Sequence, residues 1–282
     1  METRVLGRTA ERLSIVGFGG IIVKDETDTD AANYVAEAID RGVNYFDVAP
    51  GYGNAEEKLG PALEPYRDNV FLACKTHERK KEGAAADLDR SLRRLHTDHF
   101  DLYQLHGIAT KEDVETILGP GGAIETMVEA RQQGKTRFLG FSAHSEEAAI
   151  ALIDGFKFDT VLFPVNWVCW YQGGFGPRLI KRAQAEGLGI LALKSLAERQ
   201  LDDDETRPWP KCWYKPVETA ERAELALRFT LSRPVTAAVS PSHIELFRWA
   251  CDAADRFRPF TDDEETAAAR LTSGFRPIFQ TR

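Results

Sequence analysis

Four side chains suited to acid–base chemistry follow three successive β-rich segments of the sequence. Asp47 ends the second such segment, and Tyr52 follows it closely. Lys75 ends the third segment and His106 ends the fourth. Taken singly, each has an ordinary explanation as a helix cap, a packed turn residue or a strand-end polar group. Because parallel strands end at one rim, their joint occurrence favours a site where a carboxylate, a phenol, an ammonium and an imidazole meet.

The elements that would position these groups are eight short apolar runs separated by helical periods. The runs are residues 14–17, 43–46, 70–73, 102–105, 137–140, 160–163, 190–193 and 236–239. Between them, apolar residues recur with the spacing of one helix face. Three such stripes are Ala31, Val35, Ala38 and Ile39; Leu88, Leu92 and Leu95; and Phe247, Ala250, Cys251 and Ala254. Gly42, Gly134 and Gly187 follow helical segments and are typical of left-handed C-caps.

Alternation of buried strands with helices predicts parallel pairing, because the helix is the crossover that parallel neighbours need. Eight such units in 282 residues predict a closed (β/α)8 TIM barrel, an α/β fold, in a single domain over residues 1–282. The segment up to Ile15, with its Gly7-Arg8-Thr9 turn, predicts an N-terminal β-hairpin that caps the barrel floor. An open doubly wound sheet is the alternative, but residues 17–20 only weakly resemble its dinucleotide fingerprint.

Composition excludes several classes of protein. The 36 Lys and Arg against 44 Asp and Glu give a net charge of −8, opposite to what a nucleic-acid binder needs. The 43% hydrophobic and 28% charged residues are typical of a globular domain. Four cysteines without a C-x-x-C pair predict reduced thiols and no zinc site, and the acidic run 202–205 is interpreted as a solvated loop. Without a signal peptide or a membrane span, we expect a cytoplasmic protein.

Three connections that follow predicted strands are unusually long: residues 107–122, 167–176 and 197–216. All three lie on the face where barrel enzymes carry their sites. Two of them hold Trp167, Trp170, Tyr171, Trp209, Trp213 and Tyr214. These aromatic residues are interpreted either as substrate walls or as anchors of the loops themselves.

The segments 44–56 (NYFDVAPGYGNAE), 72–75 (LACK) and 101–106 (DLYQLH) resemble those of the aldo-keto reductase family. The resemblance runs over nearly the whole chain, from residues 6–8 to the eighth βα unit. It implies the same barrel, a small-molecule carbonyl substrate, and reversible reduction of aldehydes and ketones by NADPH without a metal.

The resemblance also implies a role for each of the four rim residues. Tyr52 would be the general acid that protonates the carbonyl oxygen. A free phenol has a pKa of about 10, so the ammonium of Lys75 would help it lose the proton. Asp47 would hold Lys75, and His106 would donate a hydrogen bond to the substrate oxygen. The other histidines are interpreted as structural: His77, His96, His99, His144 and His243.

For the cofactor, the resemblance implies a binding set of Gly20, Asp47, Ser142, Asn166, Lys194, Ser240, Ser242 and Arg248. Ser142 and Asn166 would hold the nicotinamide carboxamide, and Lys194 would lie near the pyrophosphate. Ser240, Ser242 and Arg248 would bind the adenosine 2′-phosphate, which favours NADP(H) while NAD(H) stays possible. Two positions depart from the family pattern: Ala143 replaces the usual Asn, and Leu193 replaces the usual aromatic residue.

Two other functions stay open. A Schiff-base aldolase would use Lys75 or Lys194 as its nucleophile, although Asp47 would raise the pKa of Lys75 and disfavour the neutral amine. A nicotinamide-binding sensor with little turnover is suggested by Ala143 and Leu193. The physiological substrate, the reaction direction and the oligomeric state are left open.

Overall fold

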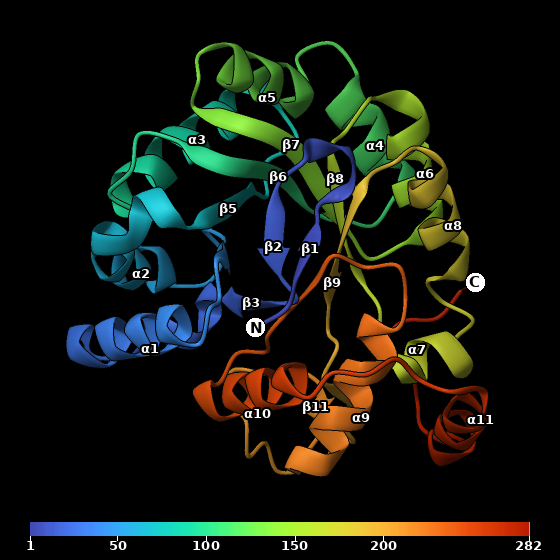
Figure 1. The fold of residues 1–282 in the computed structure, drawn as a ribbon. Coiled ribbons are helices and arrows are strands. Elements are labelled where there is room, and N and C mark those ends of the chain that lie inside the picture. Colours follow the sequence, from blue (N-terminus) through green and yellow to red (C-terminus); the bar gives the residue numbers. More distant parts are fainter. Residues whose placement is uncertain (282) are drawn as a thin grey trace.

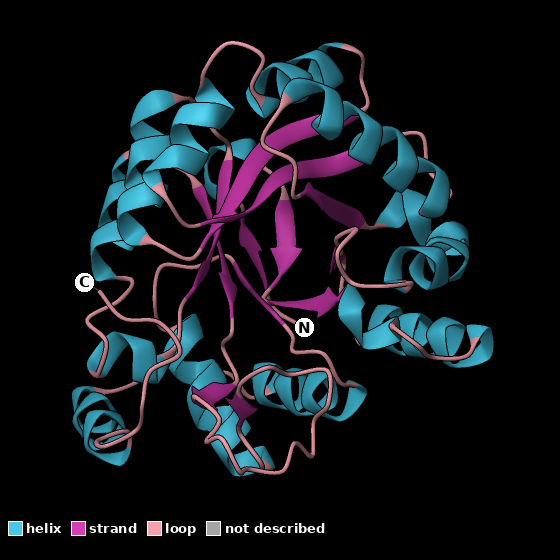
Figure 2. Cartoon of the chain, turned by 180° about the vertical axis from the view of Figure 1, so that it is seen from behind, coloured by secondary structure: helices cyan, strands magenta, loops and turns pink. Residues whose placement is uncertain are grey.

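The molecule is built on a closed barrel of eight parallel strands, as predicted (Figures 1 and 2). The computed structural model describes residues 1–281. The strands pair in the order β12-β3-β4-β5-β6-β7-β8-β9, and each of the eight predicted runs overlaps one of them. Their bounds are β3 Val16–Gly19, β4 Tyr45–Asp47, β5 Phe71–Thr76, β6 Phe100–Ile108, β7 Thr136–Ala143, β8 Thr160–Pro164, β9 Gly189–Leu193 and β12 Ala237–Val239.

Helices surround the barrel, as Figure 2 shows from behind. They are α1 Asp28–Asp40, α2 Ala55–Leu63, α3 Lys81–Arg94, α4 Lys111–Leu118, α5 Ala123–Gln132, α6 Glu146–Gly155, α7 Trp167–Tyr171, α8 Pro177–Ala185, α9 Ala220–Leu231, α10 Ile244–Asp255 and α11 Asp262–Leu271, with 3-10 turns η1 Gly7–Thr9, η2 Gly20–Val23 and η3 Glu64–Asn69. In α1, the predicted stripe of Ala31, Val35 and Ala38 is fully buried, and the Thr27 side chain caps the first turn. Gly42 follows with φ +78°, the left-handed geometry expected there.

The predicted N-terminal hairpin closes one end of the barrel. Strands β1 Thr3–Val5 and β2 Arg12–Ser14 pair antiparallel and lie across the barrel in Figure 1. Leu6 and Leu13 are buried in one cluster with residues of the barrel interior. At Gly7, which has φ +51°, a Cβ would lie 2.2 Å from the backbone nitrogen of Gly189. The hairpin therefore seats so closely that only glycine fits at this turn.

Side-chain alternation along the strands explains which residues face the interior. Tyr45, Phe71, Ala73 and Leu102 belong to the cluster that contains the hairpin leucines. Residues two apart on a strand point to the same face. Positions two or four residues beyond these, toward the carboxyl ends of β4, β5 and β6, therefore form the next layer of the barrel interior.

The three long connections hold secondary structure of their own. Residues 107–122 include α4, which begins with a capping box of Thr110 and Asp113. Residues 167–176 include α7, and residues 197–216 include β10 Ala197–Arg199 and β11 Lys215–Pro216. Of the six aromatic residues, Trp213 and Tyr214 line a cavity at the barrel mouth, and the other four pack within the fold, as anchors of the loops would.

Candidate active site

A buried ion pair lies at the carboxyl ends of β4 and β5. Lys75 and Asp47 are 1% and 3% exposed, and Lys75 Nζ donates to Asp47 Oδ1 and, at 3.1 Å, to the carbonyl oxygen of Val48. The other carboxylate oxygen of Asp47 accepts from Gln104 Nε2 at 3.0 Å and from the Tyr45 hydroxyl at 3.3 Å. Gln104, opposite Lys75 in the β5–β6 register, was not predicted as a site residue. The pair is thus held rigid by hydrogen bonds on both sides.

Tyr52 lies beside this pair, in the turn between β4 and α2. The Lys75 ammonium is 5.4 Å from the centroid of the Tyr52 ring. Burial raises the pKa of the Tyr52 phenol, and the Lys75 charge opposes this without cancelling it. For Lys75, burial alone would lower the pKa, but Asp47 and Tyr52 outweigh it and leave the pKa raised. The site therefore holds a protonated phenol against a charged ammonium at neutral pH.

A local irregularity in β6 sets the position of His106. The β6–β7 register shifts between Leu105 and Ile108, and Gly107 has φ +67°. The Ser142 hydroxyl accepts the Gly107 N–H at 2.8 Å. Such a bulge changes the direction of a neighbouring side chain. His106 packs edge-on against Tyr52, with ring centroids 5.8 Å apart and an interplanar angle of 88°.

The environment of His106 favours the neutral imidazole. Burial lowers the pKa of His106 well below its usual range, and the charges of Lys75 and of the neighbouring histidines act in the same direction. A neutral imidazole keeps one N–H with which it can donate a hydrogen bond.

Two histidines interpreted as structural lie at the site. His77 stacks on His106, and His144 lines the same cavity as His106 and Tyr52. Burial and the nearby Lys194 lower the pKa of His144 to about 4. His77 follows Lys75 by two residues, and His144 follows Ser142 by two. The strand-end rule that found the other residues, extended by two positions, would have found both.

A cavity of about 200 Å³ opens beside these residues at the carboxyl end of the barrel. Its lining includes Asp47, Tyr52, His106, His144, Leu193, Lys194, Lys211, Trp213, Tyr214, Ser240 and Ser242. Lys75 neutralises Asp47, the one carboxylate among these residues, and Glu26 pairs with Lys211 at 2.7 Å. Lys194 is therefore the cation of the lining that no carboxylate in residues 1–281 compensates.

Lys194 is held in an uncommon backbone conformation, with φ +65° at the end of β9. Its ammonium lies 4.8 Å from the ring centroid of Tyr214 and 5.3 Å from that of Trp213. These distances are typical of cation–π contacts. Burial lowers the pKa of Lys194 to about 8. The cavity thus presents a cation between two aromatic faces, suited to an anionic group.

The residues predicted to hold the nicotinamide carboxamide make internal hydrogen bonds. Besides the Ser142 contact with Gly107, Asn166 accepts from the backbone N–H groups of Val168 and Cys169 at 3.0 Å and caps α7. Its Nδ2 donates to the carbonyl oxygens of Lys194 and Ala197. Neither Ser142 nor Asn166 lines the cavity. To reach a carboxamide, either residue would have to exchange one of these hydrogen bonds.

The predicted adenosine-phosphate residues divide into two groups. Ser240 and Ser242 line the cavity, and Ser240 Oγ accepts the Gly19 N–H at 3.0 Å. Arg248 lies on α10 outside the lining and binds Glu37 of α1 through Nε and Nη2, at 2.9 Å and 2.7 Å. Gly20 begins η2 beside the cavity residues Gly19 and Ile21. The hydroxyl groups of Ser240 and Ser242 and the ammonium of Lys194 fit the pyrophosphate and nicotinamide portion of a dinucleotide. Arg248 would have to break its ion pair with Glu37 to contact the same ligand.

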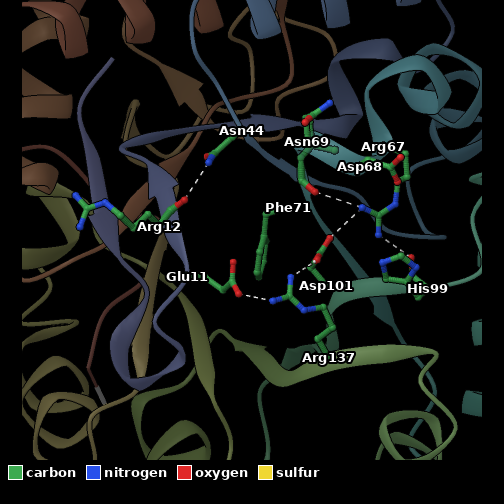
Figure 3. Close-up of a pocket in the computed structure, with 11 residues that line it drawn as sticks. Glu11, Arg12, Asn44, Arg67, Asp68, Asn69, Phe71, His99, Asp101 and Arg137 are labelled. Atoms are coloured by element: carbon green, nitrogen blue, oxygen red, sulfur yellow. Dashed lines mark hydrogen bonds and ion pairs between the residues drawn. The ribbon is translucent and has the colours of Figure 1, made fainter.

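A second cavity, of about 310 Å³, lies at the opposite end of the barrel (Figure 3). Arg67 and Arg137 converge there on Asp101, at 3.1 Å and 2.8 Å, and Asp101 also accepts the Leu72 N–H at 2.9 Å. Arg137 pairs in addition with Glu11 of the hairpin loop. Arg67, Arg137, Asp101 and Glu11 thus pair with one another, and this end of a barrel serves stability rather than catalysis.

Two further features bear on the class of protein. Among the described residues, no group of three or more His, Cys, Asp and Glu side chains is arranged to hold a metal ion. Nor does any helix in that part of the chain have the length and apolar character needed to cross a membrane.

The geometry agrees with what comparison to known proteins finds. The model of the Aldo/keto reductase family matches residues 16–267, and the chain therefore belongs to the aldo-keto reductase family. An uncharacterized oxidoreductase of Bacillus subtilis, YqkF, is 32% identical over 157 residues, which are 51% of this chain and 49% of that protein. L-galactose dehydrogenase of Arabidopsis thaliana is 28% identical over 226 residues, 74% of this chain and 70% of that enzyme.

A solved structure extends the likeness to the whole fold. The aldo-keto reductase AKR11C1 from Bacillus halodurans, in its holo form, matches with a TM-score of 0.76 and 24% identity, over 99% of this chain and 98% of that one. The alignments with two of the Bacillus subtilis relatives span only about half of those proteins, 49% and 48%.

Proposed function

We propose that this protein is an NADPH-preferring oxidoreductase that reduces aldehydes or ketones to alcohols, acting as one barrel domain over residues 1–282, with Tyr52 as the general acid. The family match and the oxidoreductase relatives support carbonyl reduction with a nicotinamide cofactor. The observation that carries the proposal is the buried Asp47–Lys75 ion pair beside Tyr52, with His106 at the same cavity. That set supplies a proton, a charge to stabilise its loss, and a hydrogen-bond donor.

The bound cofactor would supply the hydride to the carbonyl carbon. His106 would donate its N–H to the carbonyl oxygen and orient it between the imidazole and the phenol. Tyr52 would then give its proton to that oxygen as negative charge develops there. Lys75 would stabilise the resulting phenolate, and Asp47 would keep Lys75 charged and fixed. The raised pKa of Tyr52 supports this order, since the phenol begins each cycle protonated.

For the cofactor, we infer that Lys194 contacts the pyrophosphate, because it is the uncompensated cation of the lining. Ser240 and Ser242 would donate to phosphate oxygens, and Gly20 would let the backbone approach. Arg248 would bind the 2′-phosphate after exchanging its pair with Glu37. Asp47 and Leu193 both line the cavity. Asp47 would lie beside the nicotinamide, and Leu193 would supply apolar contact to it. Ser142 and Asn166 would reach the carboxamide only by giving up internal hydrogen bonds.

The test is an assay for the reduction of aliphatic, aromatic and sugar aldehydes with NADPH and with NADH. The reaction is monitored by the absorbance of the reduced nicotinamide. The Tyr52→Phe variant should lose activity by roughly 10²–10⁴-fold, the usual contribution of general acid catalysis, while its cofactor affinity is unchanged. Tyr66→Phe, a tyrosine of η3 away from the cavity, is the matched control. Near wild-type reduction by Tyr52→Phe would remove Tyr52 as the acid, and cofactor binding without turnover on any substrate would favour a sensor.

Lys194 supports one alternative, a Schiff-base lyase or aldolase. A lysine pKa of about 8 and no neutralising carboxylate favour a nucleophilic amine, whereas the raised pKa of Lys75 disfavours it. Treating the protein with borohydride in the presence of an aldehyde would trap such an adduct. A mass increase that maps to Lys194 and disappears in Lys194→Met would establish the alternative. An unmodified Lys194 peptide would eliminate it.

A further inference from the structure

The imidazole of His77 lies on the face of the His106 ring. Their ring centroids are 3.9 Å apart, and the ring planes are inclined by 30°. His77 comes from the loop after β5, whereas His106 ends the regular part of β6. On another side, His77 contacts the turn that carries Tyr52: a Cβ placed on Gly51 would lie 2.8 Å from His77 Nε2. His77 therefore occupies the space between the Tyr52 turn and the His106 ring.

Within residues 1–281, no hydrogen bond to the His106 ring fixes its orientation. Its Nδ1 is buried, and no described residue provides a hydrogen-bond partner for it. In most sites that use an imidazole, the second ring nitrogen is held by a carbonyl or a carboxylate, which sets both the tautomer and the ring direction. Among the described residues, no carbonyl or carboxylate holds Nδ1 of His106 in this way. The contacts that hold the ring are those of packing: His77 against one face, and Tyr52 edge-on at 5.8 Å.

We propose that His77 is a positioning residue for His106: by stacking on the imidazole, it fixes the direction in which His106 presents its N–H to the cavity. The role in turnover rests on the proposed function, while the effect on the His106 ring does not. Nδ1 of His106 is buried and has no partner among the described residues. In the tautomer that carries its hydrogen on Nε2, the unpartnered atom Nδ1 holds a lone pair, whereas in the other tautomer it would hold an N–H. The tautomer with its hydrogen on Nε2 puts the donor on the nitrogen that can face a ligand.

The charges around the two rings act against protonation. Lys75 on β5, His144 after β7 and Arg79 in the loop after β5 lower the pKa of His106, along with His77 itself. A proton on either stacked ring would repel a proton on the other.

The His77 ring has both positively and negatively charged neighbours. Burial and the charges of Arg79 and Lys75 lower its pKa, while Asp87 of α3 and Glu78 act in the opposite direction. The net effect is a lowered pKa, so both rings are neutral together at working pH. Removing His77 opens one face of the His106 ring to water, which makes the charged imidazolium less unfavourable.

Two substitutions separate stacking from other roles of His77. His77→Ala removes the ring, and His77→Phe keeps an aromatic face without a titratable group. His99→Gln, at a half-exposed histidine near the opposite end of the barrel, is the matched control. Each variant is tested by NMR of ¹⁵N-labelled histidine rings over a pH titration, which reports the tautomer and pKa of His106 without any turnover. Steady-state reduction of one aldehyde from pH 5 to pH 9 supplies kcat and KM separately.

His77→Ala should raise the pKa of His106, mix its tautomers and leave the cofactor KM unchanged. It should lower kcat by up to roughly 10²-fold, the loss expected when a catalytic group is misplaced by about 1 Å. The acidic limb of its pH profile should move to higher pH. His77→Phe should keep one tautomer and kcat within about threefold of wild type. Unchanged His106 resonances in His77→Ala overturn the proposal, as does a kcat loss in His77→Phe equal to that of His77→Ala. If the wild type reduces no carbonyl compound, the NMR outcome still decides the effect on the ring.

Discussion

Asn166 Nδ2 donates a hydrogen bond to the carbonyl oxygen of Lys194, 3.1 Å away. Lys194 is the strand-end residue with φ +65°, a conformation that costs energy for a residue with a side chain. The same amide donates to Ala197 and caps α7, so three segments meet at one side chain. This arrangement keeps the Lys194 ammonium between Trp213 and Tyr214 at the cavity.

Lys194→Met should weaken cofactor binding about tenfold, as expected for the loss of a hydrogen bond to a charged group. The wild-type affinity should itself depend on pH: because the pKa of Lys194 is lowered to about 8, the ammonium is present below that pH and lost above it. Dissociation constants for NADPH, measured by fluorescence from pH 6 to pH 9.5, should rise through pH 8 in the wild type and stay flat in Lys194→Met. Equal affinities at every pH would remove Lys194 from the cofactor site.

Asp47→Asn should lower the free energy of unfolding by about 3–5 kcal/mol, since it leaves the Lys75 charge buried without its partner. The double variant Asp47→Leu with Lys75→Met should recover much of that loss. The pKa of Lys75 is raised, so the stability from the pair is complete below the unfolded lysine pKa of about 10.4 and is lost as pH rises through the folded value. Urea unfolding measures the free energy of unfolding for the single variant, for the double variant and as a function of pH. An Asp47→Asn protein as stable as the wild type would contradict the prediction.

Asp101→Asn should destabilise the fold by about 2–4 kcal/mol, because Arg67 and Arg137 both converge on this carboxylate. Asp98→Asn, at a carboxylate that is 95% exposed, should leave the stability of the fold unchanged. The network of Figure 3 lies beside the hairpin residues Glu11 and Arg12, in a cavity that shares no lining residue with the cavity of Tyr52. The kcat/KM of the folded Asp101→Asn protein should therefore equal that of the wild type. Urea unfolding and an activity assay test this, and a changed kcat/KM would connect the two ends of the barrel.

Two substitutions on facing helices should change cofactor preference in opposite directions. Arg248 is paired with Glu37. Arg248→Met should reduce the preference for NADPH over NADH about tenfold, the value of a charged hydrogen bond to phosphate. Glu37→Gln frees the guanidinium and should strengthen NADPH binding while leaving NADH binding unchanged. The ratio of dissociation constants measures both, and a ratio unaffected by either variant places the 2′-phosphate elsewhere.

The periodicity of the sequence was enough to predict the barrel and the level of the site within it. Asp47, Lys75 and His106 follow apolar runs, and alternation places them in one interior layer above Tyr45, Phe71 and Leu102. That inference needed no knowledge of packing partners. Gln104 belongs to the same layer and could have been found by the same count.

Other features of the site depend on which hydrogen-bond partner each polar side chain finds. The periodicity of apolar residues does not predict these partners. The Ser142 hydroxyl accepts from Gly107 because β6 shifts register there, and Asn166 caps α7, which the sequence presented only as a long connection. The start of α4 is marked in the sequence by Thr110 and Asp113, which form a capping box. His77 was missed because it lies in the loop two residues beyond Lys75, where the search along each strand stopped.

The hairpin leucines, Leu6 and Leu13, also bear on how a ligand can reach the barrel. Their side chains are buried in one cluster with residues of the barrel interior and close its amino-terminal end. The cavity that Tyr52 lines lies at the other end. The barrel axis is therefore a packed core and not a channel, and a ligand that contacts Tyr52 enters and leaves through the carboxyl-terminal mouth.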